Sequence, residues 1–170
     1  MENFNARRIT RIGVVAALYV ALTLSLSFIS YNDIQFRVAE ALMLLCCFSK
    51  DYIFSLTIGC FITNLFSPMT MDILVGTSAT LVAAIPMYLL RKEGSLPRLM
   101  LCSLFPVISN GLIVAAELHY LMDLPYWTSA AGVAFGEFVC VSILGVVLFS
   151  QLQRNRAFMR LIIGAQSNRA

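Results

Sequence analysis

Charged residues are scarce in this chain, and their scarcity limits what it can be. Asp, Glu, Lys and Arg make up 12% of the 170 residues, whereas hydrophobic residues make up 59% and the mean hydropathy is +0.83. Such apolar content far exceeds that of an ordinary soluble protein, and the length suits a single domain over residues 1–170. The sequence therefore predicts an integral protein of the lipid bilayer. The net charge of +3 comes without the continuous basic face of a nucleic-acid-binding surface, so we expect no nucleic-acid partner.

The motifs of ATP hydrolysis, acyl transfer and metal binding are missing as well. Neither lysine follows a glycine, so there is no phosphate-binding loop of the Walker type and the chain cannot power ATP-driven transport alone. No G-x-S-x-G motif indicates a hydrolase. His119 is the single histidine, and no cysteine is suitably spaced for a zinc site, since all five cysteines lie in apolar segments as expected of small buried hydrophobes. We therefore expect no enzymatic activity, no metal and no cofactor.

What the chain has in place of charge is a series of apolar runs, each on the scale of a bilayer. Crossing about 30 Å of hydrocarbon takes roughly 20 helical residues. The runs predict an all-α bundle of six transmembrane helices near residues 9–29, 36–49, 51–67, 72–91, 98–121 and 126–152, of which the second and third are short. The first run is too long for a typical signal-peptide core and has no clear cleavage site after it, so we expect it to remain as a helix.

The basic residues indicate how this bundle is oriented. Six spans place both termini on one side, and eleven of the twelve Lys and Arg residues then lie on that side, with Arg37 as the exception. Because positive residues concentrate in cytoplasmic loops, both termini are predicted to be cytoplasmic. The outer loops then lie around residues 30–35, 67–71 and 122–126.

Polar and charged side chains interrupt the apolar runs at seven positions. Counting 1.5 Å per residue from the predicted helix ends places all of them in the outer half of the bilayer or near its midplane. They are Arg37, Glu40, Asn64, Asp72, Asn110, Glu117 and Glu137. An ionisable group inside a bilayer costs roughly 2.5–3.5 kcal/mol, so it usually pairs or lines a cavity. We interpret the set as an outward-opening ligand pocket.

Structural roles are the alternative for five of these residues. Arg37 and Glu40 are three residues apart and could neutralise each other. Asn64 and Asn110 could join helices by hydrogen bonds, and Asp72 could cap the fourth helix. A structural pair and a pocket can also coexist, so these alternatives stay open.

Glu117 and Glu137 are harder to explain structurally. Arg37 is the only basic residue in the predicted outer half, so one or both glutamates should face a ligand donor or water. Membrane carboxylates also serve in proton relays. A self-sufficient proton-coupled carrier that uses Glu40, Glu117 and Glu137 is therefore the competing function.

Small residues recur at intervals of four on the first predicted helix, at Gly13, Ala17, Ala21 and Ser25. Such a stripe lets another helix approach closely. The stripe could pack inside the chain's own bundle or against another membrane subunit.

Several segments together resemble a known family. They are residues 34–42 (IQFRVAEAL), 62–68 (ITNLFSP), 72–76 (DILVG), 110–117 (NGLIVAAE) and 136–137 (GE). The combination, spread over about residues 9–150, is similar to QueT-type queuosine-precursor transporters, which look like substrate-binding S components of energy-coupling-factor transporters. The resemblance implies a six-helix S component that captures a 7-deazaguanine such as queuine from outside.

The resemblance also implies partners. It predicts a transmembrane coupling subunit and two cytoplasmic ATPases, with the stripe of Gly13, Ala17 and Ala21 as the docking surface. Other small vitamins or nucleobase-like solutes are the alternative cargo, and an assembly protein without a ligand is a third reading.

A guanine-like ring suits the predicted pocket. Its N1 hydrogen and exocyclic amine are parallel donors that one carboxylate can accept together, so Glu117 or Glu137 could bind this edge. The ring carbonyl needs a donor, for which Asn110, Asn64 or Arg37 are candidates. The candidates for stacking on the ring face are Phe36, Tyr120, Tyr126 and Trp127.

Overall fold

The computed structural model describes residues 6–30, 36–90 and 95–163, and every regular element in these ranges is a helix. In chain order the elements are α1 (Ala6–Ser25), α2 (Ser27–Ser30), the 3₁₀-helix η1 (Val38–Cys47), α3 (Asp51–Asn64), the 3₁₀-turn η2 (Thr70–Ile73), α4 (Val75–Leu89), α5 (Leu96–Met122), α6 (Tyr126–Glu137), the π-helix η3 (Phe138–Gly145), α7 (Val146–Leu152) and α8 (Arg156–Ile163). The predicted break at residues 31–33 lies outside the described residues, as do residues 91–94 of the predicted break at 91–97. The helix α5 begins at Leu96, inside that second break.

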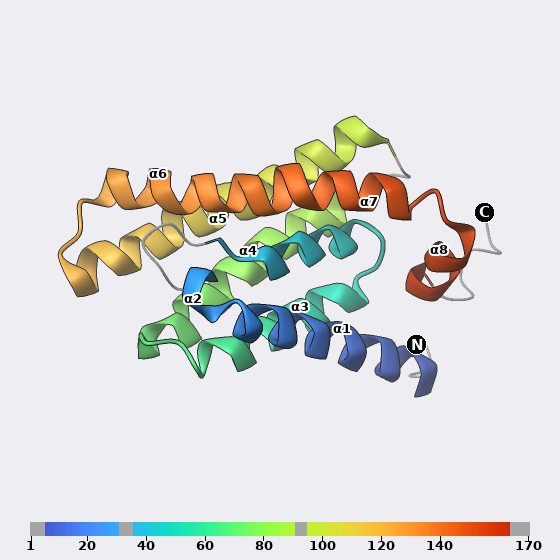
Figure 1. Ribbon diagram of the computed structural model, residues 1–170, viewed down its shortest axis with the longest axis horizontal. Helices are drawn as coiled ribbons and strands as arrows, with labels where there is room; N and C mark the ends of the chain where they lie inside the picture. The colour runs from blue at the N-terminus through green and yellow to red at the C-terminus, as the bar shows by residue number, and fades with distance from the viewer. Residues whose placement is uncertain (1–5, 31–35, 91–94, 164–170) are drawn as a thin grey trace.

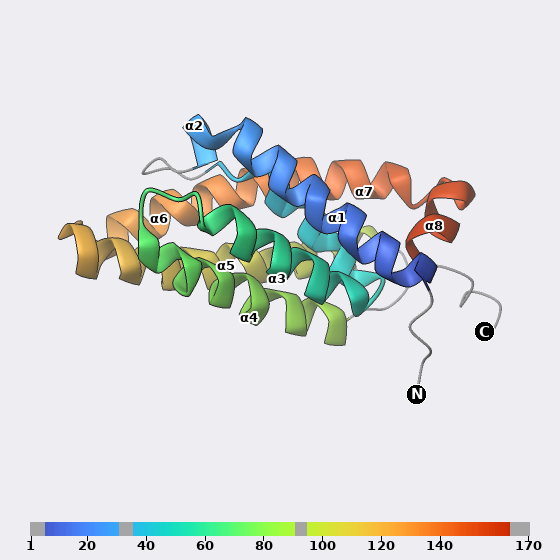
Figure 2. The same ribbon diagram turned by 90° about the horizontal axis from the view of Figure 1, so that it is seen from below.

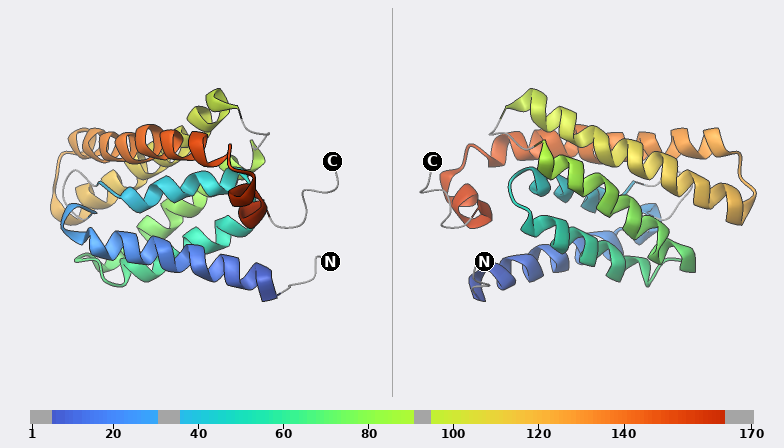
Figure 3. Two further views of the ribbon diagram at one scale, coloured as in Figure 1. Left: turned by 45° about the vertical axis from the view of Figure 1, so that its right-hand side comes forward. Right: turned by 180° about the vertical axis from the view of Figure 1, so that it is seen from behind.

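The long helices run side by side along one axis of the molecule (Figure 1). The continuous path α6–η3–α7 pairs with α5 on one side, and α1 pairs with α3 on the other (Figures 1 and 2). Between them lies η1. The start of α1 and the whole of α8 lie at the same end of the bundle (Figure 3).

Among the described residues, four helical stretches are long and apolar enough to cross a membrane, and they cover residues 6–25, 70–89, 96–122 and 126–152. The other two predicted spans correspond to η1 and α3, which have 10 and 14 residues. The fold is therefore that of an all-helical, multi-pass membrane protein. The count of six spans and their orientation stay predictions.

The predicted α-helix over residues 36–49 is wrong in its type, because η1 is a 3₁₀-helix. A 3₁₀-helix rises about 2.0 Å per residue, so ten residues cover about 20 Å, where an α-helix would cover about 15 Å. Its three residues per turn also align side chains at every third position. Arg37, which precedes η1, is thereby aligned with Glu40, Met43 and Cys46, and all four are at most 2% exposed.

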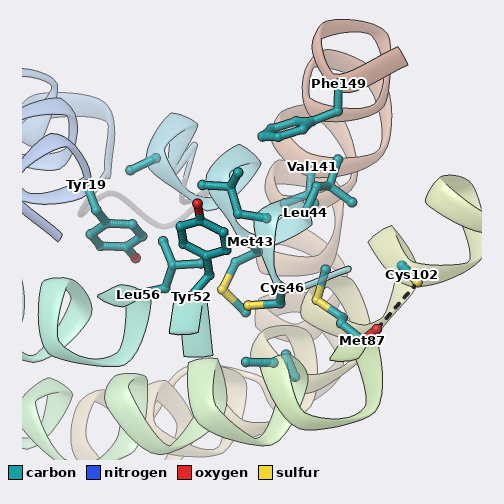
Figure 4. Packing of buried hydrophobic residues seen from close by; sticks show 14 of the residues in the cluster. Tyr19, Met43, Leu44, Cys46, Tyr52, Leu56, Met87, Cys102, Val141 and Phe149 are labelled. Carbon is teal, nitrogen blue, oxygen red and sulfur yellow. Dashed lines mark hydrogen bonds between the residues drawn. The ribbon is translucent and has the colours of Figure 1, made fainter. Parts of the chain in front are cut away.

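The hydrophobic core surrounds η1 (Figure 4). Met43, Leu44 and Cys46 of η1 are fully buried, with Leu56 of α3 and Met87 of α4 around them. A Cβ added at Gly145 would lie 3.3 Å from that of Ala41, so η1 packs closely on η3. Four of the five cysteines are buried and all five are free, as expected of small hydrophobes.

The last predicted span, 126–152, is one path with a change of winding. It is α-helical up to Glu137, follows a π-helix over η3 and returns to α-helix in α7. A π-segment adds a residue to the turn and redirects the side chains on either side of it. The change of winding therefore begins immediately after a residue of the predicted pocket.

The sequence did not predict α8. Its Ile162 is buried, and Phe158 and Ile163 pack on the core, whereas Arg156 and Arg160 are exposed. The carbonyl of Ile162 accepts hydrogen bonds from Tyr52 Oη and from Arg11 Nη1, both at 2.8 Å.

At the same end of the bundle, Arg8 donates to both carboxylate oxygens of Asp51, at 2.8 and 2.5 Å. These bonds fasten α1, α3 and α8 together at the end where the sequence predicts the cytoplasm.

Candidate ligand-binding site

All seven polar residues singled out in the sequence are buried, with exposed fractions between 0% and 5%. They come from four regions that are distant in sequence: η1 and the residue before it, the turn from α3 to η2, α5, and the end of α6. Many large hydrophobic side chains are exposed instead, such as Leu89 and Phe135. The bundle thus has an apolar surface and a polar cluster inside, and such buried polar groups in a membrane protein commonly line a functional site.

One part of this cluster, the inner group, joins α5, α6 and η1. Asn110 Nδ2 donates to Glu137 Oε1 at 2.7 Å, and Tyr19 Oη donates to Glu40 Oε1 at 2.5 Å. Glu137 also interacts electrostatically with Glu40 and Arg37. One oxygen each of Asn110, Glu40 and Glu137 has no hydrogen-bond partner among the described residues. The inner group therefore presents three buried acceptors.

A second part, the outer group, lies at the turn from α3 to η2. Asn64 Nδ2 donates to the backbone carbonyl of Asp72 at 2.8 Å, and the Ser67 hydroxyl donates to the Asp72 carboxylate. Glu117 of α5 lies close enough to Asp72 for the two carboxyl groups to interact. Asp72 Oδ1 and both carboxylate oxygens of Glu117 receive no hydrogen bond from a donor within the described part of the chain, and the two carboxyl groups lie within hydrogen-bond reach of each other.

The structure also decides one of the alternatives for Asp72. The helix α4 begins at Val75, its N-cap is Leu74, and that cap has no side-chain hydrogen bond. Asp72 lies before this boundary, within η2. It therefore does not cap the fourth helix, because the chain makes a separate 3₁₀ turn before α4 begins.

Arg37 lies between the two groups. Its guanidinium interacts electrostatically with the carboxyl groups of Glu40 and Asp72. It interacts in the same way with the carboxyl groups of Glu117 and Glu137. The predicted pairing with Glu40 is thus one of several interactions. Four buried carboxyl groups therefore interact with one buried guanidinium. Acidic groups outnumber the basic one in this cluster, which favours additional donors or protons.

Gly76 allows this close arrangement. A Cβ at that position would lie 2.8 Å from Asn64 Nδ2 and 3.7 Å from Arg37 Nη1. Contacts of 2.8 Å to a Cβ are not tolerated, so a larger residue would displace the Asn64 amide. The sequence reasoning missed Gly76, Tyr19 and Ser67 as parts of the site. Tyr19 shares a helical face with the buried Ala16 and Thr23, a spacing that could have identified it.

The four aromatic residues proposed to stack on the ligand ring have different surroundings in the structure. Phe36 is half-buried beside Arg37, and its ring meets that of Phe135 edge-on with a centroid distance of 6.3 Å. Trp127 and Tyr120 are 77% and 81% exposed. Tyr126 packs edge-on against Trp127 at 5.0 Å. Trp127 and Tyr120 thus lie at the bundle surface as interfacial aromatics do, and Tyr126 is half-buried. Phe36 directly precedes Arg37 of the polar cluster.

The stripe of small residues on α1 faces outward. Gly13, Ala17 and Ala21 are all exposed, and a Cβ added at Gly13 would meet nothing within 4 Å. The opposite face carries Tyr19, which packs against Gly59 of α3 so closely that a Cβ at Gly59 would lie 3.1 Å from it. The stripe therefore does not pack inside the chain's own bundle, because the residues that do so lie on the other face of α1.

A helical bundle that crosses the membrane several times and encloses unpartnered acceptors belongs to the class of membrane transporters and solute-binding membrane proteins. A family model described as "QueT transporter" matches residues 9–154, and the chain belongs to this family. It is 38% identical over 154 residues to the protein "Queuosine precursor transporter QueT" of Lactococcus lactis subsp. cremoris (strain MG1363), with 84% of this chain and 90% of that protein covered. No solved structure matches the chain. The resemblance seen in the sequence motifs is thereby confirmed.

Proposed function

We propose that this protein is the substrate-capture S component of an ATP-driven energy-coupling-factor importer for queuosine precursors, namely queuine or related 7-deazaguanines. The observation that carries the proposal is the set of buried acceptors without partners around Arg37. A guanine-like ring is rich in N–H donors and has one carbonyl acceptor, which is the complement of such a site. Membership of the QueT transporter family supports the same conclusion.

In this proposal the chain crosses the cell membrane six times, with both termini in the cytoplasm. The shorter elements η1 and α3 complete the four long stretches. The basic residues Arg8, Arg11, Arg156 and Arg160 share the end of the bundle where α1 begins and where α8 lies. The positive-inside tendency makes that end cytoplasmic.

Glu137 is the residue we assign to the guanine edge. Asn110 holds one of its oxygens at 2.7 Å, and the other oxygen has no partner among the described residues. A carboxylate fixed in this way can accept from the N1 hydrogen and the exocyclic amine of the ring. Arg37 supplies the donor for the ring carbonyl, and Phe36 is placed to contact the ring face.

Energy for uptake comes from other chains in this proposal. This sequence has no phosphate-binding loop, so two cytoplasmic ATPases must act through a transmembrane coupling subunit. We assign the docking of that subunit to Gly13, Ala17 and Ala21, because their outward position on α1 lets a partner helix approach closely.

The test is a thermal-shift screen of the purified protein against 7-deazaguanines, guanine and several vitamins. A ligand at about 100 times its Kd stabilises a protein by about 2.7 kcal/mol, so the cargo should raise the Tm clearly. Stabilisation by 7-deazaguanines supports the proposal. Stabilisation by a vitamin alone would identify an S component for another solute, and no stabilisation by any compound would overturn ligand capture.

The competing function is a proton-coupled carrier that uses Glu40, Glu117 and Glu137. The unpartnered oxygens of these three residues are the observation that favours it. Vesicles that contain this protein alone, with a proton gradient and no ATPase, separate the two functions. Uptake into these vesicles would support the carrier and overturn the dependence on ATPases.

A further inference from the structure

We infer that Asp72 and Glu117 form a subsite for a protonated amine, so that the site selects 7-deazaguanines with an aminoalkyl group at position 7 over uncharged ones. The inference rests on the proposed function and adds the charge of the cargo to it. It starts from an imbalance: the cluster buries four carboxyl groups and one guanidinium.

Glu117 is the main observation. It is 5% exposed, and no donor among the described residues reaches either of its carboxylate oxygens, while its carboxyl group lies within hydrogen-bond reach of that of Asp72. A guanine edge needs only one carboxylate, and Glu137 with Asn110 already meets that need. Glu117 therefore has a ligand-facing role that the ring edge does not explain.

Asp72 is held in position beside Glu117. Ser67 donates to its carboxylate, and Asn64 donates to its backbone carbonyl at 2.8 Å. Only Asp72 Oδ1 is left without a partner in the described part of the chain. Together the two neighbouring carboxyl groups present three oxygens that receive no hydrogen bond from a donor among the described residues, and an alkylammonium group has three N–H donors.

A metal ion would be the other cation to fit between two carboxylates. The described residues contain no group of three or more His, Cys, Asp or Glu side chains that could hold one. An ammonium needs fewer ligands, and its N–H bonds to carboxylates are the strong, charge-assisted type. The chemistry of this pair therefore favours an amine.

The spacing of the two groups matches a single ligand. Glu117 follows Asn110 by seven residues on α5, so it lies about 10 Å further along that helix, on nearly the same face. In a 7-deazaguanine the guanine edge and position 7 are at opposite ends of the bicyclic ring. A ring whose edge is bound by Glu137 and Asn110 then directs its 7-substituent towards Asp72 and Glu117, with Arg37 between.

The experiment compares two ligands that share the ring and differ in the charge of the substituent. They are 7-aminomethyl-7-deazaguanine, which is protonated at neutral pH, and 7-cyano-7-deazaguanine, which is neutral. Isothermal titration calorimetry on the purified wild-type protein should give an affinity for the amine about tenfold or more above that for the nitrile. Equal affinities, or tighter binding of the nitrile, would overturn the inference.

Variants then locate the selectivity. Glu117→Gln and Asp72→Asn should each lower the affinity for the amine about tenfold and change that for the nitrile less than about threefold. Glu137→Gln is the matched control, because it should weaken both ligands equally. Equal losses for both ligands in Glu117→Gln would overturn the amine subsite and leave the proposed function standing. If the wild-type protein binds neither compound, the proposed function itself is overturned.

Discussion

Asn110 and Glu137 are joined by a 2.7 Å hydrogen bond between α5 and α6, and the bond leaves one Glu137 oxygen available inside the bundle. The bond orients the carboxylate while its charge stays uncompensated by Asn110. A purely structural pair would satisfy both partners, and for this reason we propose Glu137 as a binding group. The same pattern recurs where Tyr19 holds Glu40.

The first prediction concerns Glu137→Gln. The glutamine carbonyl can still accept from Asn110, so the fold should persist, but the charge that receives the guanine edge is lost. We expect the affinity for a 7-deazaguanine to fall by about 1–3 kcal/mol, measured by calorimetry. Asp123→Asn is the matched control, because Asp123 is exposed at the left-handed end of α5, a conformation that asparagine tolerates. Unchanged affinity in Glu137→Gln would refute the assignment of the ring edge.

Gly76→Ala is predicted to disturb the site through the backbone. The new methyl group would lie 2.8 Å from Asn64 Nδ2, so the amide must move and its bond to the Asp72 carbonyl is strained. We expect a loss of roughly 1–3 kcal/mol in stability together with weaker ligand binding. Gly13→Ala is the control, since a Cβ there meets nothing within 4 Å and alanine favours a helix. The two variants should therefore shift the Tm in opposite directions, and a stable Gly76→Ala protein would contradict the close approach.

Much of the fold could be predicted because a membrane-spanning helix requires a long, continuous run of apolar residues. Run length and hydropathy located α1, α5 and the path from α6 to α7 to within a few residues. The winding of η1 and η3 could not be predicted in this way. The two segments are about a hundred residues apart and meet where Gly145 approaches Ala41 and Leu44, and local periodicity contains no information about such a contact.

The sequence predicted which residues belong to the polar cluster, but it did not predict which of them contact each other. A polar residue in an apolar run is conspicuous, so all seven could be picked out and all seven are buried. Which of them meet depends on the rotation of each helix about its axis. The bonds of Tyr19 to Glu40 and of Ser67 to Asp72 were therefore missed, since a tyrosine and a serine in such a sequence are usually interfacial or helix-packing residues.

Tyr52→Phe tests how α8 is fastened. The hydroxyl of Tyr52 donates to the carbonyl of Ile162 at 2.8 Å, and Arg11 donates to the same carbonyl. Removal of one of these bonds should lower the free energy of unfolding by about 0.5–1.5 kcal/mol, measured by thermal unfolding. It should also increase the cleavage of the α8 segment by protease. Tyr120→Phe, at a side chain that is 81% exposed, should change neither. Identical protease sensitivity of Tyr52→Phe and the wild type would show that α8 is held by its apolar face alone.

The final prediction separates capture from transport. Ala17 and Ala21 are exposed on the face of α1 opposite Tyr19, the residue of this helix that bonds to Glu40, so Ala17→Leu and Ala21→Leu should bind a 7-deazaguanine with unchanged affinity. A leucine on the stripe keeps a partner helix from approaching closely, and uptake into cells that express the coupling subunit and ATPases should therefore be abolished. Ala131→Leu, at an exposed alanine of α6, adds the same bulk elsewhere on the surface and should transport normally. Normal uptake by both α1 variants would refute docking at the stripe, and loss of uptake in Ala131→Leu as well would show that added surface bulk alone blocks transport.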